Sequence, residues 1–244
     1  MIDTIILLTG PVEEVALAEV LRRHNETLAI HPVRTQEQLE TLDPAAIARA
    51  RLIGFVTPVV VPPHILNALG FGAYNFHPGP PNYPGWIPAH FAIYDKATTF
   101  GATAHRMAEQ VDAGPIVDVE LFDIPPGINV TRLQEMAFTQ VARLFWRLAP
   151  ALALQSAPVA ELPVKWTGTK STKRMHKAIC DLPPDISPQE LQRRIEAFGA
   201  GDFGVELTVT LHGHKFRYVA PEPGTKAEPP KNETTTRAPA TLVA

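Results

Sequence analysis

The chain has 244 residues, of which 45% are hydrophobic and 19% charged, enough for one buried core with a modest extension, which argues against a disordered or fibrous protein. The formal net charge of −3 excludes a general attraction to nucleic acid or membranes, so a phosphate-bearing partner needs a local basic site. A single cysteine, Cys180, excludes an intramolecular disulfide and a thiolate metal cluster.

The first part of the chain alternates apolar runs with helical patterns. Residues 4–8, 28–33 and 52–56 predict buried strands, and helical spacing predicts helices over 12–23, 36–42 and 63–69. This alternation is typical of a parallel sheet covered by helices. The run over 5–8 is too short for a signal or membrane helix, so we expect a soluble, cytoplasmic protein without membrane or DNA partners.

A fourth predicted strand over 73–77 ends at His77, on the side where open sheets bind ligands, beyond the carboxyl ends of the strands. The proline- and glycine-rich segment 78–88 predicts an ordered loop. A helix over 89–96 and strands over 101–107 and 116–124 follow, with Asp112 in the polar turn between the strands. Thr131 and Gln134 predict a capping box for a long helix that closes the main domain.

Beyond that helix, residues 187–190 form a second capping signature, and apolar runs over 205–211 and 215–219 predict a hairpin. Residues 221–244 are rich in Pro, Thr, Lys and Glu, which predicts a flexible tail. The expected architecture is α/β: a Rossmann-like, mostly parallel sheet with covering helices over 1–156, and a small helix-and-hairpin appendage over 157–220. The edge of the hairpin could pair with a second copy, which predicts a possible homodimer.

Three motifs occur in order along the main domain: Asn75-Phe76-His77-Pro78-Gly79, then Gly101-x-Thr103-x-His105, then Asp112-Ala113-Gly114. Through them the chain resembles the formyltransferase family, which includes methionyl-tRNA, glycinamide ribonucleotide and nucleotide-sugar formyltransferases. The resemblance implies a Rossmann-like fold and 10-formyltetrahydrofolate as the formyl donor. It also places the family's catalytic Asn, His and Asp on Asn75, His77 and Asp112.

These residue types suit formyl transfer to an amine. Attack on the formyl carbon creates an oxyanion, for which the amide of Asn75 and a protonated His77 are hydrogen-bond donors. The carboxylate of Asp112 favours the imidazolium and can accept the proton that the amine loses. Taken singly, each residue also fits a structural role: a loop contact for Asn75, a structural histidine for His77 and an ordinary turn for Asp112.

The resemblance further implies that folate binds along residues 55–61 and 111–114, with contacts at Phe55, Val59, Val60, Val61, Val111 and Gly114. The valines are alternatively core residues. Four supporting residues are expected near the substrate: Gly79, Trp86, Thr103 and His105. Of these, His105 is otherwise a core histidine, and Trp86 either stacks on a base or sugar or holds its loop to the core. Gly79 replaces a frequent Ser and residues 80–81 replace a usual pair of leucines, which leaves the acceptor open.

Four histidines, at positions 64, 77, 90 and 105, match no compact ligand motif, so we predict no metal. A basic run over 165–177 either contacts acceptor phosphates or is a solvated surface. The appendage resembles that of sugar N-formyltransferases, so the expected acceptor is a nucleotide-linked amino sugar. The alternatives are methionyl-tRNA or glycinamide ribonucleotide formyltransferase activity, formyltetrahydrofolate hydrolysis, and folate binding without catalysis.

Overall fold

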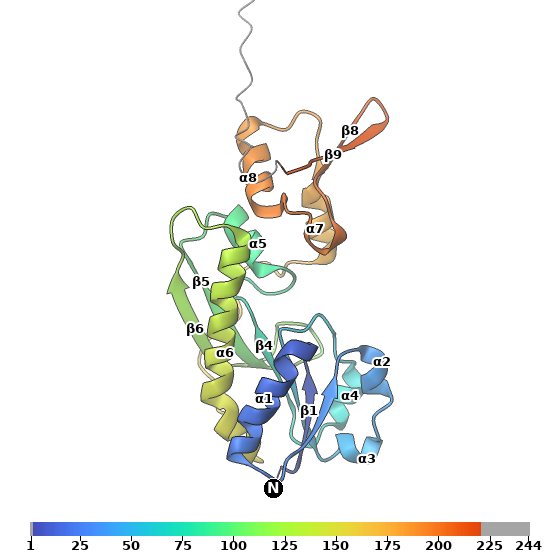
Figure 1. The fold of residues 1–244 in the computed structure, drawn as a ribbon, viewed down its shortest axis with the longest axis vertical. Helices are drawn as coiled ribbons and strands as arrows, with labels where there is room; N and C mark the ends of the chain where they lie inside the picture. Colours follow the sequence, from blue (N-terminus) through green and yellow to red (C-terminus); the bar gives the residue numbers. More distant parts are fainter. Residues whose placement is uncertain (1, 221–244) are drawn as a thin grey trace, which may run out of the picture.

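The computed structural model describes residues 2–220, so the predicted tail lies outside the described residues. Figure 1 shows a main domain built on one twisted sheet and a smaller C-terminal part beyond α5. The main sheet has six strands in the order β2-β1-β3-β4-β5-β6, with β1 to β4 parallel and β5 and β6 antiparallel to their neighbours. The predicted α/β fold with a mostly parallel sheet is confirmed.

The elements of the main domain follow in chain order. They are β1 (Thr4–Leu8), α1 (Pro11–His24), β2 (Ala29–Val33), α2 (Gln36–Glu40), α3 (Pro44–Ile47), β3 (Ala50–Phe55), α4 (Pro63–Ala68), β4 (Ala73–His77), α5 (Pro88–Tyr94), β5 (Thr99–Arg106), β6 (Ile116–Asp123) and α6 (Val130–Leu154). The C-terminal part contains α7 (Lys173–Cys180), β7 (Asp181–Leu182), α8 (Pro188–Phe198), η1 (Asp202–Gly204), β8 (Thr208–Leu211) and β9 (His214–Arg217).

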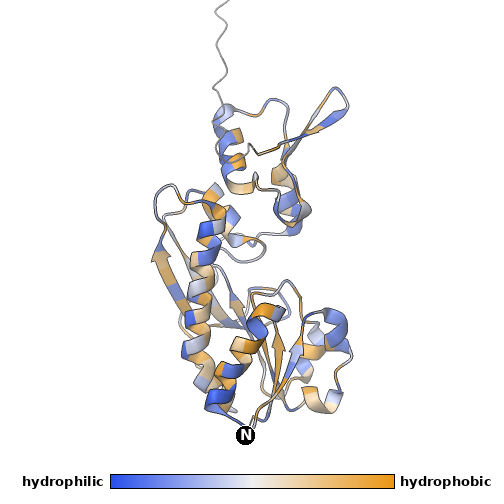
Figure 2. Cartoon of the chain, in the orientation of Figure 1, coloured by the Kyte–Doolittle hydropathy of each residue, from blue (hydrophilic) through white to orange (hydrophobic). Residues whose placement is uncertain are grey.

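The sheet is covered on both faces by amphipathic helices. Helices α1 and α6 bury their apolar sides with Ile5, Leu7 and Phe55 in one core cluster, while α2, α3 and α4 cover Ile6 and Leu8 on the opposite face. Alternate residues of β1 therefore enter different clusters, as the period of two requires. In Figure 2, α1 and α6 carry both hydrophobic and hydrophilic colours, as expected of helices with one buried side.

The C-terminal end of α6 is held by a buried arginine. Arg51 on β3 has no exposed surface, and its guanidinium lies 5.2 Å from the ring centroid of Tyr74. Its N–H groups donate to backbone oxygens at the C-terminal end of α6, in the segment that follows it, and just before β4. Those acceptors are Phe71, Ala151, Leu152, Gln155 and Ala157. Arg51 thereby ties the closing helix to the centre of the sheet.

Three details differ from the sequence prediction. The N-cap of α6 is Asn129, whose side chain accepts from the backbone N–H of Arg132, so the predicted capping box at Thr131 is wrong by two positions. Helix α7 was not anticipated, although Thr172 caps it as an acceptor. The hairpin is shorter than predicted and gains a third strand, β7, on its inner side. Pairing of its outer edge with a second subunit stays a prediction.

The C-terminal part packs on α5 of the main domain. Phe198 of α8 is buried against Phe91 and Tyr94, with ring centroids at 5.6 and 5.9 Å, and Arg193 donates to the backbone oxygen of Tyr94 at 2.8 Å. Because α5 directly follows the loop after β4, this contact brings the appendage to the ligand-binding edge of the sheet. Within residues 2–220, no helix combines the length and hydrophobicity needed to cross a membrane.

Candidate functional site

Two of the sequence motifs meet as neighbouring strands. In the antiparallel pairing of β4 with β5, Asn75 lies opposite His105 and His77 lies opposite Thr103. Each motif spaces its polar residues by two, so both members of each motif point to the same face of the sheet. The hydroxyl of Thr103 donates to the backbone oxygen of Gly79 at 2.8 Å and so holds the start of the following loop.

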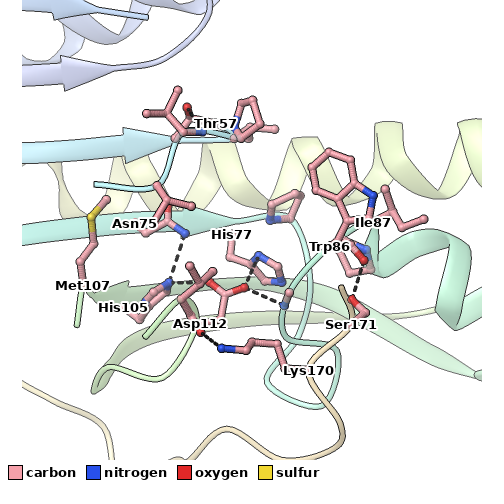
Figure 3. A pocket seen from close by; sticks show the side chains of 18 of the residues that line it. Thr57, Asn75, His77, Trp86, Ile87, His105, Met107, Asp112, Lys170 and Ser171 are labelled. Atoms are coloured by element: carbon pink, nitrogen blue, oxygen red, sulfur yellow. Dashed lines mark hydrogen bonds and ion pairs between the residues drawn. The ribbon is translucent and has the colours of Figure 1, made fainter. Parts of the chain in front are cut away.

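Asp112 reaches this face from the loop between β5 and β6, as Figure 3 shows. Its Oδ2 lies 3.4 Å from Nδ1 of His77 and accepts the backbone N–H of Gly85 at 2.7 Å. Its Oδ1 approaches Nε2 of His105 at 3.2 Å but makes no hydrogen bond of good geometry within the described part of the chain. The carboxylate is buried between two imidazoles, with one oxygen less well satisfied than the other.

The surroundings keep Asp112 ionised. Burial alone would raise the pKa of Asp112, but the nearby imidazoles of His77 and His105 and the N–H of Gly85 together hold it well below its usual range. Nε2 of His77 lies 3.0 Å from the backbone oxygen of Tyr83, so this nitrogen is a donor. The ring of His77 thus has a carboxylate beside Nδ1 and a carbonyl beside Nε2, both of which are hydrogen-bond acceptors.

Both ring nitrogens of His105 have polar neighbours. Its Nδ1 lies 2.9 Å from the backbone oxygen of Arg106 and therefore carries a proton. Its Nε2 is 3.2 Å from Nδ2 of Asn75 and equally far from Oδ1 of Asp112. The neutral ring accepts from the amide, whereas the protonated ring donates to the carboxylate.

The loop after β4 is held against the site by a segment far along the chain. The backbone N–H of Trp86 donates to the oxygen of Ser171 at 3.1 Å, and that of Ser171 donates to Pro84 at 3.0 Å. Gly85 has φ of 97°, and a Cβ there would collide with the backbone oxygen of Ser171, so only glycine fits this crossing. Gly85 in turn presents its N–H to Asp112.

Sequence reasoning missed Trp166. Its indole packs edge-on against both His77 and His105, with ring centroids at 5.7 and 5.0 Å, and its Nε1–H donates to the backbone oxygen of Gly114 at 2.8 Å. It therefore covers the buried charges of the site from outside. No local pattern marks this residue, because its partners lie on strands and loops far away in the chain.

The polar residues open into a cavity of about 540 Å³ whose exposed surface is mainly apolar. Its lining includes Val59, Val60, Trp86, Lys173 and Phe203. Strained backbone gathers around this cavity. Among residues 2–220, six non-glycine residues have positive φ, and four of them line the cavity: Val56, Ile87, Asp112 and Phe203. Such conformations cost about 1–3 kcal/mol each and cluster at functional sites.

The structure places the predicted contact residues in two groups. Nine of them line the cavity: Asn75, His77, Asp112, His105, Trp86, Val59, Val60, Val61 and Val111. Phe55, Gly79, Thr103 and Gly114 do not. Phe55 is a core residue against Phe76 and Phe145, because its side chain points to the α6 face of the sheet. Gly114 contributes only its close packing against the backbone of Arg106 and its bond to Trp166.

The histidines and lysines separate in the same way. Only His77 and His105 of the four histidines reach the cavity, and in the described part of the chain no three potential ligands converge as a metal site requires. From the basic run, Lys170 and Lys173 line the cavity. The other three basic residues of that run are exposed and do not line it: Lys165, Arg174 and Lys177.

Comparison with known proteins supports the resemblance seen in the motifs. A family model described as formyl transferase matches residues 19–146, which is 128 of 244 residues and includes Asn75, His77, His105 and Asp112. Among curated proteins, the methionyl-tRNA formyltransferase of Listeria welshimeri is 27% identical over 149 residues, covering 60% of this chain and 47% of the relative. The chain thus spans about half the length of the curated relatives it matches.

Solved structures share the fold. A sugar N-formyltransferase from a Shewanella species superposes with a TM-score of 0.72 at 18% identity, over 89% of this chain and 96% of that one. An N-formyltransferase from Helicobacter canadensis, solved with folinic acid and dTDP-3-aminofucose, superposes with a TM-score of 0.60 at 15% identity, over 87% and 85% of the two chains. The likeness extends over the C-terminal part as well as the main domain.

Proposed function

The chain belongs to the formyl transferase family, and from this we propose that it moves a formyl group from 10-formyltetrahydrofolate to the primary amine of a nucleotide-linked amino sugar. The observation that carries the proposal is the convergence of Asn75, His77 and Asp112 on one wall of a largely apolar cavity. Its volume of about 540 Å³ falls in the range of small-molecule sites.

The lining chemistry fits a folate. Val59, Val60 and Val111 present apolar surface, and Val60 and Val111 are 54% and 41% exposed, so they are available to cover a flat ring. Burying that surface is favourable at roughly 25 cal/mol per Å². When bound, the donor supplies a formyl carbon that an amine can attack. Phe55 and Gly114 are not part of this proposal, since neither lines the cavity.

In the proposed reaction, the amine nitrogen bonds to the formyl carbon, and the carbonyl electron pair moves to oxygen. The contact with His105 uses one N–H of Asn75, so the second can donate to this oxyanion. His77 is the second donor. To reach the oxyanion, its Nε2–H must replace its hydrogen bond to the backbone oxygen of Tyr83 or divide that N–H between the two oxygens. One such donor is typically worth a factor of about 10² to 10³ in turnover.

Protons are handled by the carboxylate and the two imidazoles. Asp112 accepts the proton that the attacking nitrogen loses, through Oδ1 or a bridging water. As the bond between the formyl carbon and the donor nitrogen breaks, that nitrogen must gain a proton, and the protonated His77 or His105 can supply it. The carboxylate then reprotonates the ring, so the site ends with the protons it began with.

The overall architecture supports a sugar acceptor. The chain covers nearly the whole sugar N-formyltransferase from Shewanella, including the C-terminal part, but only about half of the methionyl-tRNA enzymes. That C-terminal part contributes Lys173 and Phe203 to the cavity, where an acceptor can reach them. The curated relatives keep methionyl-tRNA as the second candidate acceptor, because the relatives that are 26–28% identical to this chain include methionyl-tRNA formyltransferases.

The test is release of tetrahydrofolate from 10-formyltetrahydrofolate in the presence of separate acceptors. The panel consists of water alone, nucleotide-linked 3-amino and 4-amino sugars, glycinamide ribonucleotide and methionyl-tRNA. The proposal expects acceleration by an amino sugar that is lost in Asp112→Asn. Acceleration by methionyl-tRNA alone would overturn the acceptor, and fast release with water alone would identify a hydrolase.

A further inference from the structure

A short turn of the appendage reaches into the cavity. Phe203 lies in η1 with φ of 57° and ψ of 26°, between Gly201 and Gly204, which also have positive φ. Its side chain is 60% exposed, yet it lines the cavity and lies 5.0 Å from Trp86 between ring centroids. A bulky residue in the left-handed region is uncommon and persists only where its surroundings hold it.

Asp202, next to Phe203 in the chain, fixes this turn to the main domain. Oδ2 of Asp202 accepts from Nε2 of His90 at 2.9 Å, and His90 is 1% exposed on α5. Burial lowers the pKa of His90 and outweighs the opposing effect of Asp202, so the ring is neutral and Nε2–H donates. The His90 ring also stacks on Phe198, at 6.0 Å and 22°. The turn is therefore fastened to a rigid, buried side chain of the main domain.

One lysine lies over Trp86 of the aromatic pair Trp86–Phe203, and a second lysine lines the same cavity. Nζ of Lys173 lies 4.7 Å from the centroid of Trp86, and Nζ of Lys170 donates to the backbone oxygen of Val111 at 3.2 Å. Within residues 2–220, neither lysine forms a salt bridge, and Asp112 is the one acidic residue lining the cavity. The cavity thus joins an exposed aromatic corner to positive charge that no carboxylate neutralises.

We infer that Trp86, Phe203, Lys170 and Lys173 form the acceptor subsite and bind a nucleoside diphosphate. The planar base packs on the aromatic corner, and the phosphates lie against the lysines. Asp202 and His90 are positioning residues, since they act through Phe203. This inference rests on the proposed function for its link to catalysis, but binding of the nucleotide can be measured without it. An aromatic corner alone would suit a nucleoside, and lysines alone would suit an inorganic phosphate; their combination selects the nucleotide.

The first experiment measures binding by calorimetry. Thymidine and uridine diphosphates are compared with inorganic pyrophosphate and the matching nucleosides, on the wild type and on Phe203→Ala, Phe203→Tyr and Lys173→Ala. We expect Phe203→Ala to raise the Kd of a nucleoside diphosphate by about tenfold and Phe203→Tyr to leave it nearly unchanged. Lys173→Ala should weaken binding and reduce its dependence on salt. Phe216→Ala is the matched control, because Phe216 is 53% exposed but on the hairpin, outside the cavity lining.

Asp202→Ala tests the fastening of the turn. We expect it to raise the KM of the acceptor about tenfold with little change in kcat, and Asp202→Asn, which keeps an acceptor oxygen for His90, to recover most of the loss. If Asp202→Ala lowers the thermal stability as well as raising the KM of the acceptor, and Asp202→Asn restores neither, the contact is merely structural and the positioning role is overturned.

The outcomes separate this inference from the proposed function. If the wild type formylates an amine but binds no nucleoside diphosphate, the subsite is wrong and formyl transfer stands. If Phe203→Ala weakens binding of 5-formyltetrahydrofolate instead, the aromatic corner belongs to the donor and the inference fails. Nucleotide binding that depends on Phe203 and Lys173, without any formyl transfer, would support the subsite and refute the proposed function. If tRNA inhibits formyl transfer but nucleoside diphosphates do not, the nucleotide subsite is also overturned.

Discussion

Replacing the carboxylate of Asp112 by an amide tests the centre of the site with the smallest change of shape. In Asp112→Asn, the amide oxygen can still accept the N–H of Gly85, which the carboxylate binds at 2.7 Å. The charge that faces His77 at 3.4 Å and His105 at 3.2 Å is lost, and with it the proton acceptor. The fold should survive, while the protonated rings lose their counter-charge.

The expected loss can be estimated from what the carboxylate does. A positioned proton acceptor contributes a factor of about 10² to 10⁴, which at 1.36 kcal/mol per tenfold is about 2.7–5.4 kcal/mol in the activation free energy. We expect kcat for the amine acceptor to fall by about 10³, since the variant also removes the charge that favours a protonated His77. The KM of the donor should change much less, because Asp112 is only 5% exposed and therefore offers little contact area to a ligand.

The assay is single-turnover release of tetrahydrofolate at saturating donor and acceptor, with circular dichroism to confirm that the variant folds. Glu109→Gln is a matched control, since Glu109 is an exposed carboxylate on the same loop that does not line the cavity. A rate for Asp112→Asn within threefold of wild type, in a folded protein, would refute the assignment of the proton acceptor.

The same residue gives a signed dependence of stability on pH. The folded-state pKa of Asp112 lies below its unfolded value of about 3.9, so the unfolded chain binds more protons in that window and stability rises with pH there. The contribution of Asp112 is fully present above about pH 5 and is lost as the pH falls through the folded pKa. The free energies of unfolding of wild type and Asp112→Asn in urea should therefore begin to converge below about pH 4 and approach each other further toward pH 2. A constant difference down to pH 2 would contradict the charge pairing.

Three further predictions address the frame around the site. Arg51→Met should lower the free energy of unfolding in urea by about 3–5 kcal/mol, because it leaves five backbone oxygens without their buried donor; a loss below 1 kcal/mol would show that water replaces the guanidinium. Gly85→Ala should fold but lose at least tenfold in kcat, because the new Cβ must displace the segment at Ser171 and thereby move the N–H that donates to Asp112. Gly127→Ala is the control for positive φ, since a Cβ at Gly127 meets open space. Burial raises the pKa of the Cys180 thiol to about 11, so alkylation at pH 8 should be at least a hundredfold slower in the folded protein than in guanidinium, and equal rates would mean that α7 opens readily.

The sequence by itself determined the secondary structure of the main domain and the identity of its polar centre. The periods of apolar residues reflect local geometry, so all six strands of the main sheet and the long helices were predictable to within a few residues. The spacing of two in Asn75-x-His77 and Thr103-x-His105 also placed each pair on one face of a strand, and the antiparallel register then set Asn75 beside His105. Asp112 was added to them by the resemblance of the ordered motifs to the formyltransferase family, and the structure places its carboxylate beside both histidines.

Only the tertiary structure decided which side chains reach the ligand. Phe55 and Val60 lie in the same predicted folate-binding segment, 55–61, but the sheet directs Phe55 into the core and the loop leaves Val60 at the cavity. Trp166 and Phe203 carry no local signal, because their positions depend on how the chain returns over the site after α6 and α8. Contacts over such separations are set by the packing of whole elements, and periodicity within one element contains no information about them.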